Sequence, residues 1–221
     1  MNASAPRISI LMVNYNGLTH LEECLSSIYS QDFNDFEIVM VDNASKDASV
    51  EFVEKRFPFV KTIRSARNLG FAGGNNLGLP HCRGYYVFLL NNDTRLDQDA
   101  LKALSEAIHL HPQVHVFACF LIDFKDQKRV DSAGDTIYTT GIPFSFTGFP
   151  VSHFTNERPV TSACAGAAAY SRTVLEKLKG FDEDFFLLFE DLDPHIRNGH
   201  GQSVVETNTT QGQRQTQCGH T

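Results

Sequence analysis

The sequence lacks any apolar run near the ~20 residues that a membrane-spanning helix needs. Residues 1–7 also lack the basic-then-apolar pattern of a secretion signal. We therefore expect a soluble, cytoplasmic protein, with at most a peripheral association with the inner face of the membrane. Its five cysteines are far apart and form no CxxC pair, which favours free thiols in a reducing compartment.

Basic residues are also scarce, with 19 Lys and Arg against 26 Asp and Glu and a formal net charge of -7. No stripe of Lys or Arg offsets this charge, so a nucleic-acid partner is disfavoured. A GxGxxG turn is missing as well, because the first apolar run leads into Asn14-Tyr15-Asn16-Gly17. This absence argues against a dehydrogenase of the Rossmann type.

What the sequence does contain is a series of apolar runs that end abruptly in polar residues. The runs 8–13, 37–41 and 85–90 end on Asn14, on Asp42-Asn43 and on Asn91-Asn92-Asp93. Amphipathic stretches alternate with such runs up to about residue 120, which predicts an α/β fold with a mainly parallel sheet sandwiched by helices. Ligands bind beyond the carboxyl ends of the strands in such sheets, so these polar groups are expected to converge.

Helix signals lie between the runs. Thr19 and Glu22 match a capping box before a helical apolar pattern, and Asp97 is placed to cap a later helix. A Gly-rich segment, 67–76, is expected to open a short helix whose backbone N–H groups can approach an anion. Taken alone, that segment could equally be a simple turn.

The chemistry suggested by these strand ends is metal-assisted. Asp93 beside two asparagines suits Mg²⁺ or Mn²⁺, which are held by one or two carboxylates together with water and substrate phosphates. A nucleotide diphosphate is therefore the expected ligand. Each Asp could instead cap a turn or helix, but three polar strand ends on one edge make that interpretation weaker.

A second acidic region, 181–193, is dense in Phe and carboxylates. A carboxylate flanked by Phe is partly desolvated, which raises its pKa and favours a role as general base. The alternative is a helix start rich in acids for dipole reasons. A glycoside hydrolase also uses two carboxylates, but it does not explain a diphosphate-metal site.

Taken together, these segments resemble the family 2 glycosyltransferases with the GT-A fold, particularly the rhamnosyltransferase-like branch. The resemblance covers residues 8–193 and rests on five segments in order: Val13-Asn14-Tyr15-Asn16, Val41-Asp42-Asn43-Ala44-Ser45, Asn68 to Asn76, Asn91-Asn92-Asp93-Thr94, and Gly180-Phe181-Asp182 through Glu190-Asp191. It implies the Rossmann-like GT-A architecture of nucleotide-diphospho-sugar transferases.

The resemblance also implies the function. The chain is expected to be an inverting, metal-assisted glycosyltransferase of the hexosyltransferase type, acting in polysaccharide and cell-envelope biosynthesis. It would use a dTDP-, UDP- or GDP-sugar and a saccharide or lipid-linked acceptor. Asp191 would be the catalytic base, supported by Glu190, and Asp93 would bind the metal. The implied nucleotide-sugar-binding residues are Asn14, Tyr15, Asn16, Asp42, Asn43, Asn68, Gly70, Asn76, Asn92 and Asp93.

Two departures from the family pattern stand out. Asn91 replaces the first acid of a strict DxD motif, so metal binding is expected to rest on Asp93. Pro194 interrupts the helix expected after the Glu-Asp pair, which predicts a catalytic domain over 1–193, truncated or frame-shifted after Asp193, and a polar, disordered tail over 194–221. The alternative function is therefore a catalytically impaired, sugar-nucleotide-binding remnant of such an enzyme.

Overall fold

The computed structural model describes residues 5–137, 143–154, 158–160, 163–184 and 204–214. Helices and strands alternate through its first half, as expected from the apolar runs. The elements are β1 Ile8–Asn14, α1 Leu18–Tyr29, β2 Phe36–Asp42, α2 Ser49–Arg56, β3 Val60–Arg64, α3 Gly70–Gly78, η1 Leu79–His81, β4 Tyr86–Leu90, β5 Thr94–Leu96, α4 Ala100–Leu110, β6 Val116–Asp123, β7 Val130–Ser132, β8 Asp135–Ile137, β9 Pro143–Ser145, η2 Val151–His153, β10 Arg158–Val160, β11 Ala167–Ser171, α5 Arg172–Leu178 and β12 Val204–Arg214.

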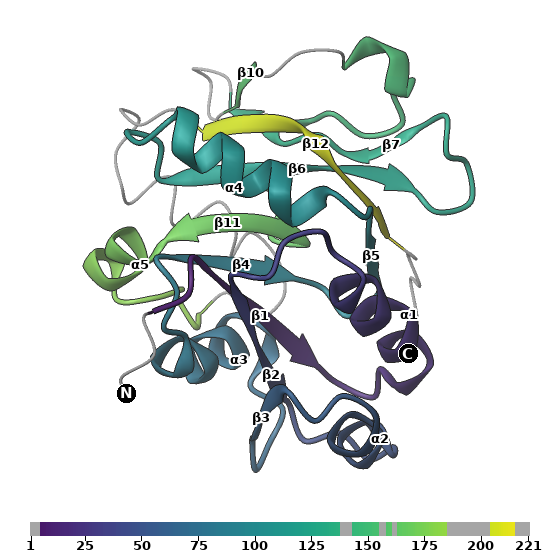
Figure 1. Ribbon diagram of the computed structural model, residues 1–221, viewed down its shortest axis with the longest axis vertical. Helices are drawn as coiled ribbons and strands as arrows, with labels where there is room; N and C mark the ends of the chain where they lie inside the picture. Colours follow the sequence, from purple (N-terminus) through teal and green to yellow (C-terminus); the bar gives the residue numbers. More distant parts are fainter. Residues whose placement is uncertain (1–4, 138–142, 155–157, 161–162, 185–203, 215–221) are drawn as a thin grey trace.

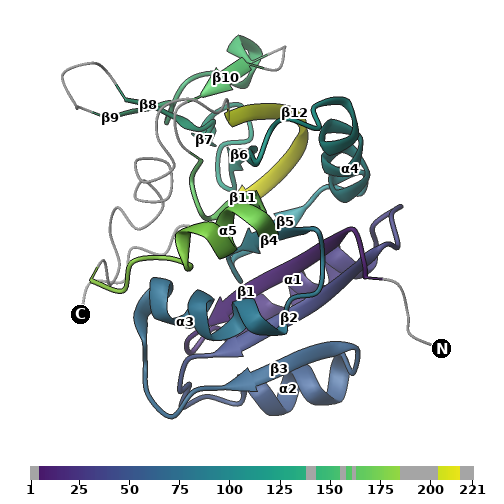
Figure 2. The ribbon, with the colours of Figure 1, turned by 90° about the vertical axis from the view of Figure 1, so that its left-hand side faces the viewer.

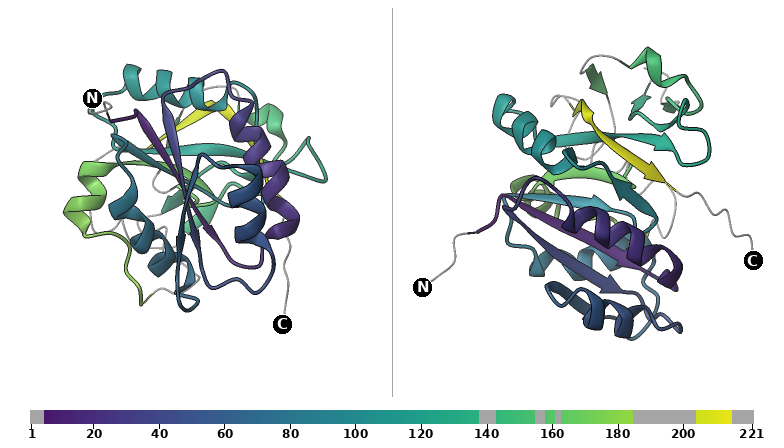
Figure 3. Two further views of the ribbon diagram at one scale, coloured as in Figure 1. Left: turned by 60° about the horizontal axis from the view of Figure 1, so that its bottom comes forward. Right: turned by 45° about the vertical axis from the view of Figure 1, so that its right-hand side comes forward.

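One mixed sheet organises the molecule, with its strands in the order β10-β12-β6-β11-β4-β1-β2-β3 (Figure 1). Helices α1, α2 and α4 cover one face of this sheet, and α3 and α5 cover the other (Figures 2 and 3). Each face has its own apolar core. Strand β1 contributes to both, because Ile10 and Met12 pack beneath α1 while Leu11 packs beneath α3. The expected α/β class with a helix-covered sheet is confirmed.

The order of the strands creates a topological switch point. Strand β1 pairs in parallel with β2 on one side and with β4 on the other. The chain therefore winds outward through β2 and β3 and then returns to place β4 against the free side of β1. Crevices beyond the carboxyl ends of two such strands are the usual ligand sites of open α/β sheets. The polar residues identified in the sequence lie at or directly after the ends of β1, β2 and β4.

The predicted helices form, but two of their predicted caps are wrong. Helix α1 begins at Leu18 after an N-cap at Gly17, and no side-chain cap bond forms there. The N–H of Leu18 instead donates to Oδ2 of Asp47 over 3.1 Å, so a residue from the loop after β2 replaces the local capping box. Helix α4 has Asp99 as its N-cap, and Asp97 contributes only its backbone carbonyl, to the N–H of Ala100.

The described residues between β6 and β11 include four short strands, β7, β8, β9 and β10. Strand β12 lies within 194–221, the segment for which the sequence predicts a disordered tail. It pairs in parallel with β6 and antiparallel with β5 and β10. Backbone pairing, which needs few apolar side chains, accounts for a strand in so polar a segment. The division of the chain at residue 193 stays a prediction.

Two further expectations concern the covalent state and the membrane. Cys24, Cys82, Cys119 and Cys164 are free thiols, and Cys218 lies outside the described residues. Within the described part of the chain, no helix combines the length and the apolar character that a bilayer crossing requires.

Candidate functional site

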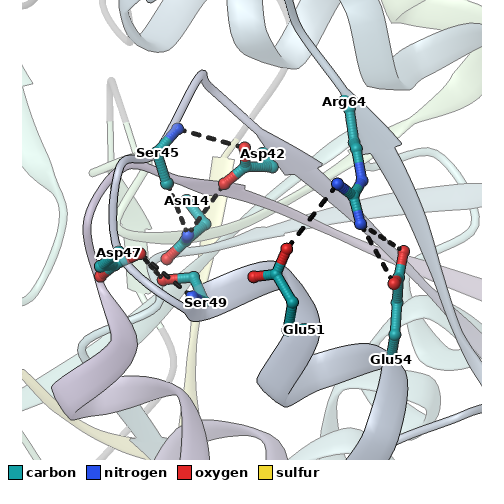
Figure 4. Close-up of polar contacts among 8 residues, drawn as sticks. All are labelled: Asn14, Asp42, Ser45, Asp47, Ser49, Glu51, Glu54 and Arg64. Carbon is teal, nitrogen blue, oxygen red and sulfur yellow. Dashed lines mark hydrogen bonds and ion pairs between the residues drawn. The ribbon is translucent and has the colours of Figure 1, made fainter.

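A network of side chains joins the ends of β1, β2 and β4. Asn14 is fully buried at the end of β1. Its Oδ1 accepts a hydrogen bond of 2.7 Å from Nδ2 of Asn92, which follows β4. Its Nδ2 donates to Oδ1 of Asp42 over 3.4 Å and to Oγ of Ser45 over 3.2 Å. One buried amide thus links three segments that are distant in sequence, and Figure 4 shows the part of this network around Asp42.

Asp42 is held in a fixed orientation at the end of β2. Its side chain is 5% exposed. Asn14 contacts Oδ1, and Oδ2 accepts a hydrogen bond of 3.2 Å from the backbone N–H of Ser45. A buried carboxylate with fixed donors is a rigid acceptor, since neither its position nor its rotamer can change without breaking these bonds. Such a group suits recognition of an N–H on a ligand.

The Gly-rich segment is hydrogen-bonded to Asn43, the residue directly after Asp42 and β2. Asn43 accepts a 2.9 Å bond from the N–H of Leu69 and donates a 2.9 Å bond to the carbonyl of Gly70. Nδ2 of Asn43 also lies 2.9 Å from Oδ1 of Asn68, which in turn accepts from the N–H of Gly70. Asn43 and Asn68 together therefore fix the start of α3 beside the strand ends. The short helix that this segment was expected to open is confirmed, because α3 begins at Gly70 within it.

Tyr15 and Asn16 are exposed residues of the loop that follows β1. Tyr15 is 47% exposed, which leaves much of its ring surface open to a ligand. Asn16 adopts a left-handed conformation with φ 52°. Its Oδ1 accepts a 2.7 Å bond from the N–H of Lys46, and its own N–H donates to Oγ of Ser45 over 2.9 Å. The loops after β1 and β2 are therefore bound to each other.

Asp93 follows Asn92 and lies partly buried against α1. It lines a small pocket together with His20, Glu23 and Cys24 of that helix. Burial raises the pKa of the Cys24 thiol, and the negative charge of Asp93 raises it further. Cys24 is therefore a neutral thiol at physiological pH and not a thiolate ligand.

The donor set at Asp93 limits the kind of metal site that is possible. Over the described ranges, no group of three or more His, Cys, Asp and Glu side chains is placed to hold a metal ion. One carboxylate fits a Mg²⁺ or Mn²⁺ ion that takes its other ligands from water and substrate phosphates. The residues present therefore fit a metal that arrives with a diphosphate, and they do not form a metal cage of their own.

Asn76 lies in α3, away from the linked strand ends, and has other partners. Its Oδ1 accepts from the N–H of Phe181 over 2.8 Å, and its Nδ2 donates to the carbonyl of Phe181 over 2.9 Å and to Oε1 of Glu183 over 3.0 Å. The proposed base Asp191 and its neighbour Glu190 lie outside the described residues. Of the ten predicted binding residues, hydrogen bonds hold seven around the ends of β1, β2 and β4 and the start of α3, namely Asn14, Asn16, Asp42, Asn43, Asn68, Gly70 and Asn92. Tyr15 and Asp93 are chain neighbours of this group, and Asp93 lines the pocket against α1.

Sequence reasoning assigned no role to three residues of this region. Ser45 joins the Asn14–Asp42 pair, Asp47 caps α1, and Gly17 makes room for the Asn14–Asn92 contact. The run Asp42-Asn43-Ala44-Ser45-Lys46-Asp47 is rich in residues that bond to nearby backbone, and this was the available signal. The partners of Ser45 and Asp47, however, are Asn14, Asn16 and Leu18, which are 29 to 31 residues away.

Comparison with known proteins identifies the family. The model of the family described as "Glycosyl transferase family 2" matches residues 9–179. A relative from Campylobacter jejuni, a GalNAc(5)-diNAcBac-PP-undecaprenol beta-1,3-glucosyltransferase, is 25% identical over 82% of this chain and 56% of its own length.

Solved structures show the same fold. The TarS 1-349 structure from S. aureus superposes with a TM-score of 0.74 at 19% identity, over 94% of this chain and 60% of that one. GalNAc-T7 with UDP, GalNAc and Mn²⁺ gives a TM-score of 0.74 at 14% identity, over 96% of this chain and 44% of that one. This chain thus spans less than two thirds of each of these proteins. The fold is that of the GT-A glycosyltransferases, and the chain belongs to glycosyl transferase family 2.

Proposed function

We propose that this chain transfers a sugar from a nucleotide-diphospho-sugar to a hydroxyl group of a saccharide or lipid-linked acceptor, with inversion at the anomeric carbon. The observation that carries the proposal is the buried amide of Asn14, which joins Asp42 and Asn92 at the switch point of the sheet. A rigid set of polar groups at that position suits a nucleotide. Family membership supports the type of reaction.

The nucleotide is proposed to bind with its base against Asp42. The fixed carboxylate can accept a hydrogen bond from a ring or exocyclic N–H of the base, and exposed Tyr15 offers a ring surface nearby. TarS has been solved with UDP and with UDP-GlcNAc, which supports a pyrimidine nucleotide among the candidates. UDP-, dTDP- and GDP-sugars are all retained, with dTDP-rhamnose as the donor that the rhamnosyltransferase-like branch suggests.

The diphosphate is proposed to bind at Asn92 and Asp93. Asp93 would hold a Mg²⁺ or Mn²⁺ ion, which when bound stabilises the negative charge of the departing diphosphate as a Lewis acid. The Mn²⁺ and UDP in the GalNAc-T7 structure support this assignment. Asn92 contributes by its position, since its bond to Asn14 fixes the turn that carries Asp93.

Transfer itself needs a base. Asp191, supported by Glu190, is proposed to take the proton of the acceptor hydroxyl. The hydroxyl oxygen then forms a bond to the anomeric carbon, and the bond from that carbon to the diphosphate oxygen breaks. Because attack and departure are in line on opposite sides, the anomeric configuration is inverted. The undecaprenol-linked substrate in the name of the C. jejuni relative supports a lipid-linked acceptor, as in cell-envelope polysaccharide synthesis.

The test is a calorimetric titration of the purified chain with UDP, dTDP and GDP, each with and without Mn²⁺. Metal-dependent binding of one nucleotide is the expected result, and it identifies the donor class without knowledge of the acceptor. A folded sample that binds none of the three contradicts the proposal. Binding without turnover, tested with the matching nucleotide sugars, supports the alternative of a catalytically impaired remnant.

A further inference from the structure

Asp93 lies in a tight turn between β4 and β5. The N–H of Thr94 donates to the carbonyl of Asn91 over 3.1 Å, which closes the turn around Asn92 and Asp93. The sheet holds the first part of this turn, because the side chain of Asn92 bonds to Asn14 at the end of β1. The chain that leaves the turn through β5 is held by a different element, the helix α1, which packs against β5.

Two buried polar side chains of α1 bond to the backbone on either side of Asp93. Before it, the Sγ of Cys24 lies 3.7 Å from the carbonyl oxygen of Asn91. After it, the Oγ of Ser27 accepts a hydrogen bond of 3.0 Å from the N–H of Leu96. The Ser27 hydroxyl donates its own hydrogen to the carbonyl of Cys24 over 2.7 Å, which fixes the orientation of the oxygen. The backbone is thus bonded to α1 two positions before Asp93 and three positions after it.

Gln31, just beyond the end of α1, extends the same attachment past β5. Its Nε2 donates to the carbonyl of Asp97 over 2.7 Å and to the carbonyl of Ser27 over 3.0 Å. Its Oε1 accepts a 2.9 Å bond from the N–H of Leu101 at the start of α4. Ser27 and Gln31 are each 7% exposed, so these bonds form away from water. Buried polar groups with all their partners in place hold a backbone rigidly.

The position of the Asp93 carboxylate matters because it is the protein ligand proposed for the metal. A Mg²⁺ or Mn²⁺ ion held by one carboxylate takes its other ligands from water and substrate phosphates, so that carboxylate must meet the diphosphate at a fixed place. Groups that orient a metal ligand without touching the metal are worth about 10–100-fold in metal affinity. The contacts from α1 are of this kind, since they fix the backbone that carries Asp93.

We propose that Ser27 and Gln31 are positioning residues for the metal-binding carboxylate of Asp93, with Ser27 as the principal contact. Both side chains are engaged with backbone groups of the segment that leaves the turn, and they act on the metal through that segment. The inference rests on the proposed function for the role of Asp93, while the hydrogen bonds themselves are independent of it. Removal of the Ser27 hydroxyl should weaken the metal site and leave the contacts of the nucleotide base intact.

The first experiment measures the Mn²⁺ gain, defined as the ratio of the nucleotide dissociation constant with a chelator to that with Mn²⁺. In Ser27→Ala this gain should fall by about 10-fold, while the affinity with a chelator stays unchanged. The matched control is Ser26→Ala, the same substitution at an exposed neighbouring position of α1, which should keep the full gain. An unchanged gain in folded Ser27→Ala would overturn the proposal. An equal loss of affinity with and without Mn²⁺ would also overturn it, because a general structural role predicts that result.

Two further variants test the route through Asp93. Gln31→Ala removes the bonds to Asp97 and Leu101 and should lower the Mn²⁺ gain in the same direction, which keeps the proposal testable if Ser27→Ala does not fold. A full gain in Gln31→Ala would contradict its role. In the Asp93→Ala background the metal ligand is already absent, so Ser27→Ala should cause no further loss of affinity with Mn²⁺. A further loss there would mean that Ser27 acts through another part of the site, against the proposal.

Amide hydrogen exchange separates this inference from the proposed function. The N–H of Leu96 should exchange slowly in the unaltered chain and faster in Ser27→Ala, whether or not the chain binds a nucleotide. Fast exchange at Leu96 in an unaltered chain that binds nucleotide with Mn²⁺ overturns the inference and leaves the proposed function in place. Slow exchange in a chain that binds no nucleotide supports the contact but refutes both the proposed function and the positioning role of Ser27.

Discussion

The Nδ2 atom of Asn92 lies 2.7 Å from Oδ1 of Asn14, so one side-chain hydrogen bond ties the carboxyl end of β4 to that of β1. The other side of the same Asn14 amide faces Asp42 and Ser45 at the end of β2. A substitution at Asn14 should therefore affect nucleotide binding and stability together, because the amide is buried and has partners on both sides.

Asn14→Asp is the sharpest test of this arrangement. It replaces a donor by a carboxylate beside Asp42, so the variant should lose about 1–3 kcal/mol of unfolding free energy at neutral pH. Burial and the charge of Asp42 raise the folded-state pKa of the new carboxyl group at position 14 above its unfolded value. Between the unfolded-state and the folded-state pKa, the folded state binds more protons than the unfolded state. The unfolding free energy therefore falls as pH rises through this range.

Urea unfolding near pH 5 and near pH 8 measures this pH dependence of the unfolding free energy. Asn14→Ala is the control, since it removes the amide without adding a charge and should be destabilised to a similar extent at both pH values. If Asn14→Asp showed no more pH dependence than Asn14→Ala, the proximity of positions 14 and 42 would be in doubt.

Gly17→Ala should disturb the site through packing. The added Cβ would collide with Nδ2 of Asn92 and Oδ1 of Asn14, so their bond must break or shift. Overpacking of this kind costs about 1–3 kcal/mol, and nucleotide affinity should fall with it. Thermal unfolding and calorimetry measure the two effects. Thr19→Ala, at an exposed helix position that makes no cap bond, should change neither quantity.

Asp47→Asn should weaken the attachment of α1 to the loop after β2. Partial burial by itself would raise the pKa of Asp47, but hydrogen bonds from Ser49 and Leu18 outweigh it and lower the pKa. A lowered pKa contributes stability above the unfolded value of about 3.9, and this contribution is lost as pH falls through the folded value. The variant should lose about 1 kcal/mol at neutral pH, the typical worth of a helix cap.

Acid unfolding curves test the sign of this effect. The difference in unfolding free energy between Asp47→Asn and the unaltered chain should be largest at neutral pH and should shrink as the solution is acidified. A difference that stays constant down to the acid transition would mean that the charge of Asp47 does not act through these hydrogen bonds.

Asp93→Ala should abolish metal-dependent nucleotide binding. The carboxylate is the proposed protein ligand of a metal that also contacts the diphosphate. Its loss should therefore remove the increase in nucleotide affinity that Mn²⁺ gives. Calorimetric titrations with Mn²⁺ and with a chelator measure that increase. Equal affinity of the variant and the unaltered chain under both conditions would remove Asp93 from the site.

Asp191→Asn should separate binding from transfer. An amide of the same shape cannot accept the proton of the acceptor hydroxyl, so transfer should stop while nucleotide binding is retained. Product formation from the matching nucleotide sugar measures the first effect and calorimetry the second. Full transferase activity of this variant would exclude Asp191 as the base.

The sequence was most informative where a signal is local. The apolar runs at 8–13, 37–41 and 85–90 predicted β1, β2 and β4, because a strand buried on both faces must be apolar throughout. The polar residues directly after these runs could be placed on one edge of the sheet, because the carboxyl ends of parallel strands lie on the same edge. The helix opened by the Gly-rich segment and the helix carrying Leu101 and Leu104 were also predicted from their patterns.

Contacts between distant residues could not be predicted in this way. Asp47 rather than Thr19 caps α1, because two loops that follow different strands meet only when the sheet forms. Asn76 belongs to the segment that marks the family, yet its partners are on Phe181 and Glu183. Strand β12 forms within a segment without a strand pattern, since its backbone is paired by neighbouring strands.

The sequence by itself thus determined the fold class, the family and the residues that gather at the strand ends, since each depends on short-range pattern and chain order. The tertiary structure alone decided which of these side chains face each other. It linked Asn14 to Asp42 and Asn92, and it turned Asn76 toward Phe181. The physical reason is that a hydrogen bond depends on distance and direction in space, which only the packed sheet and its helices fix.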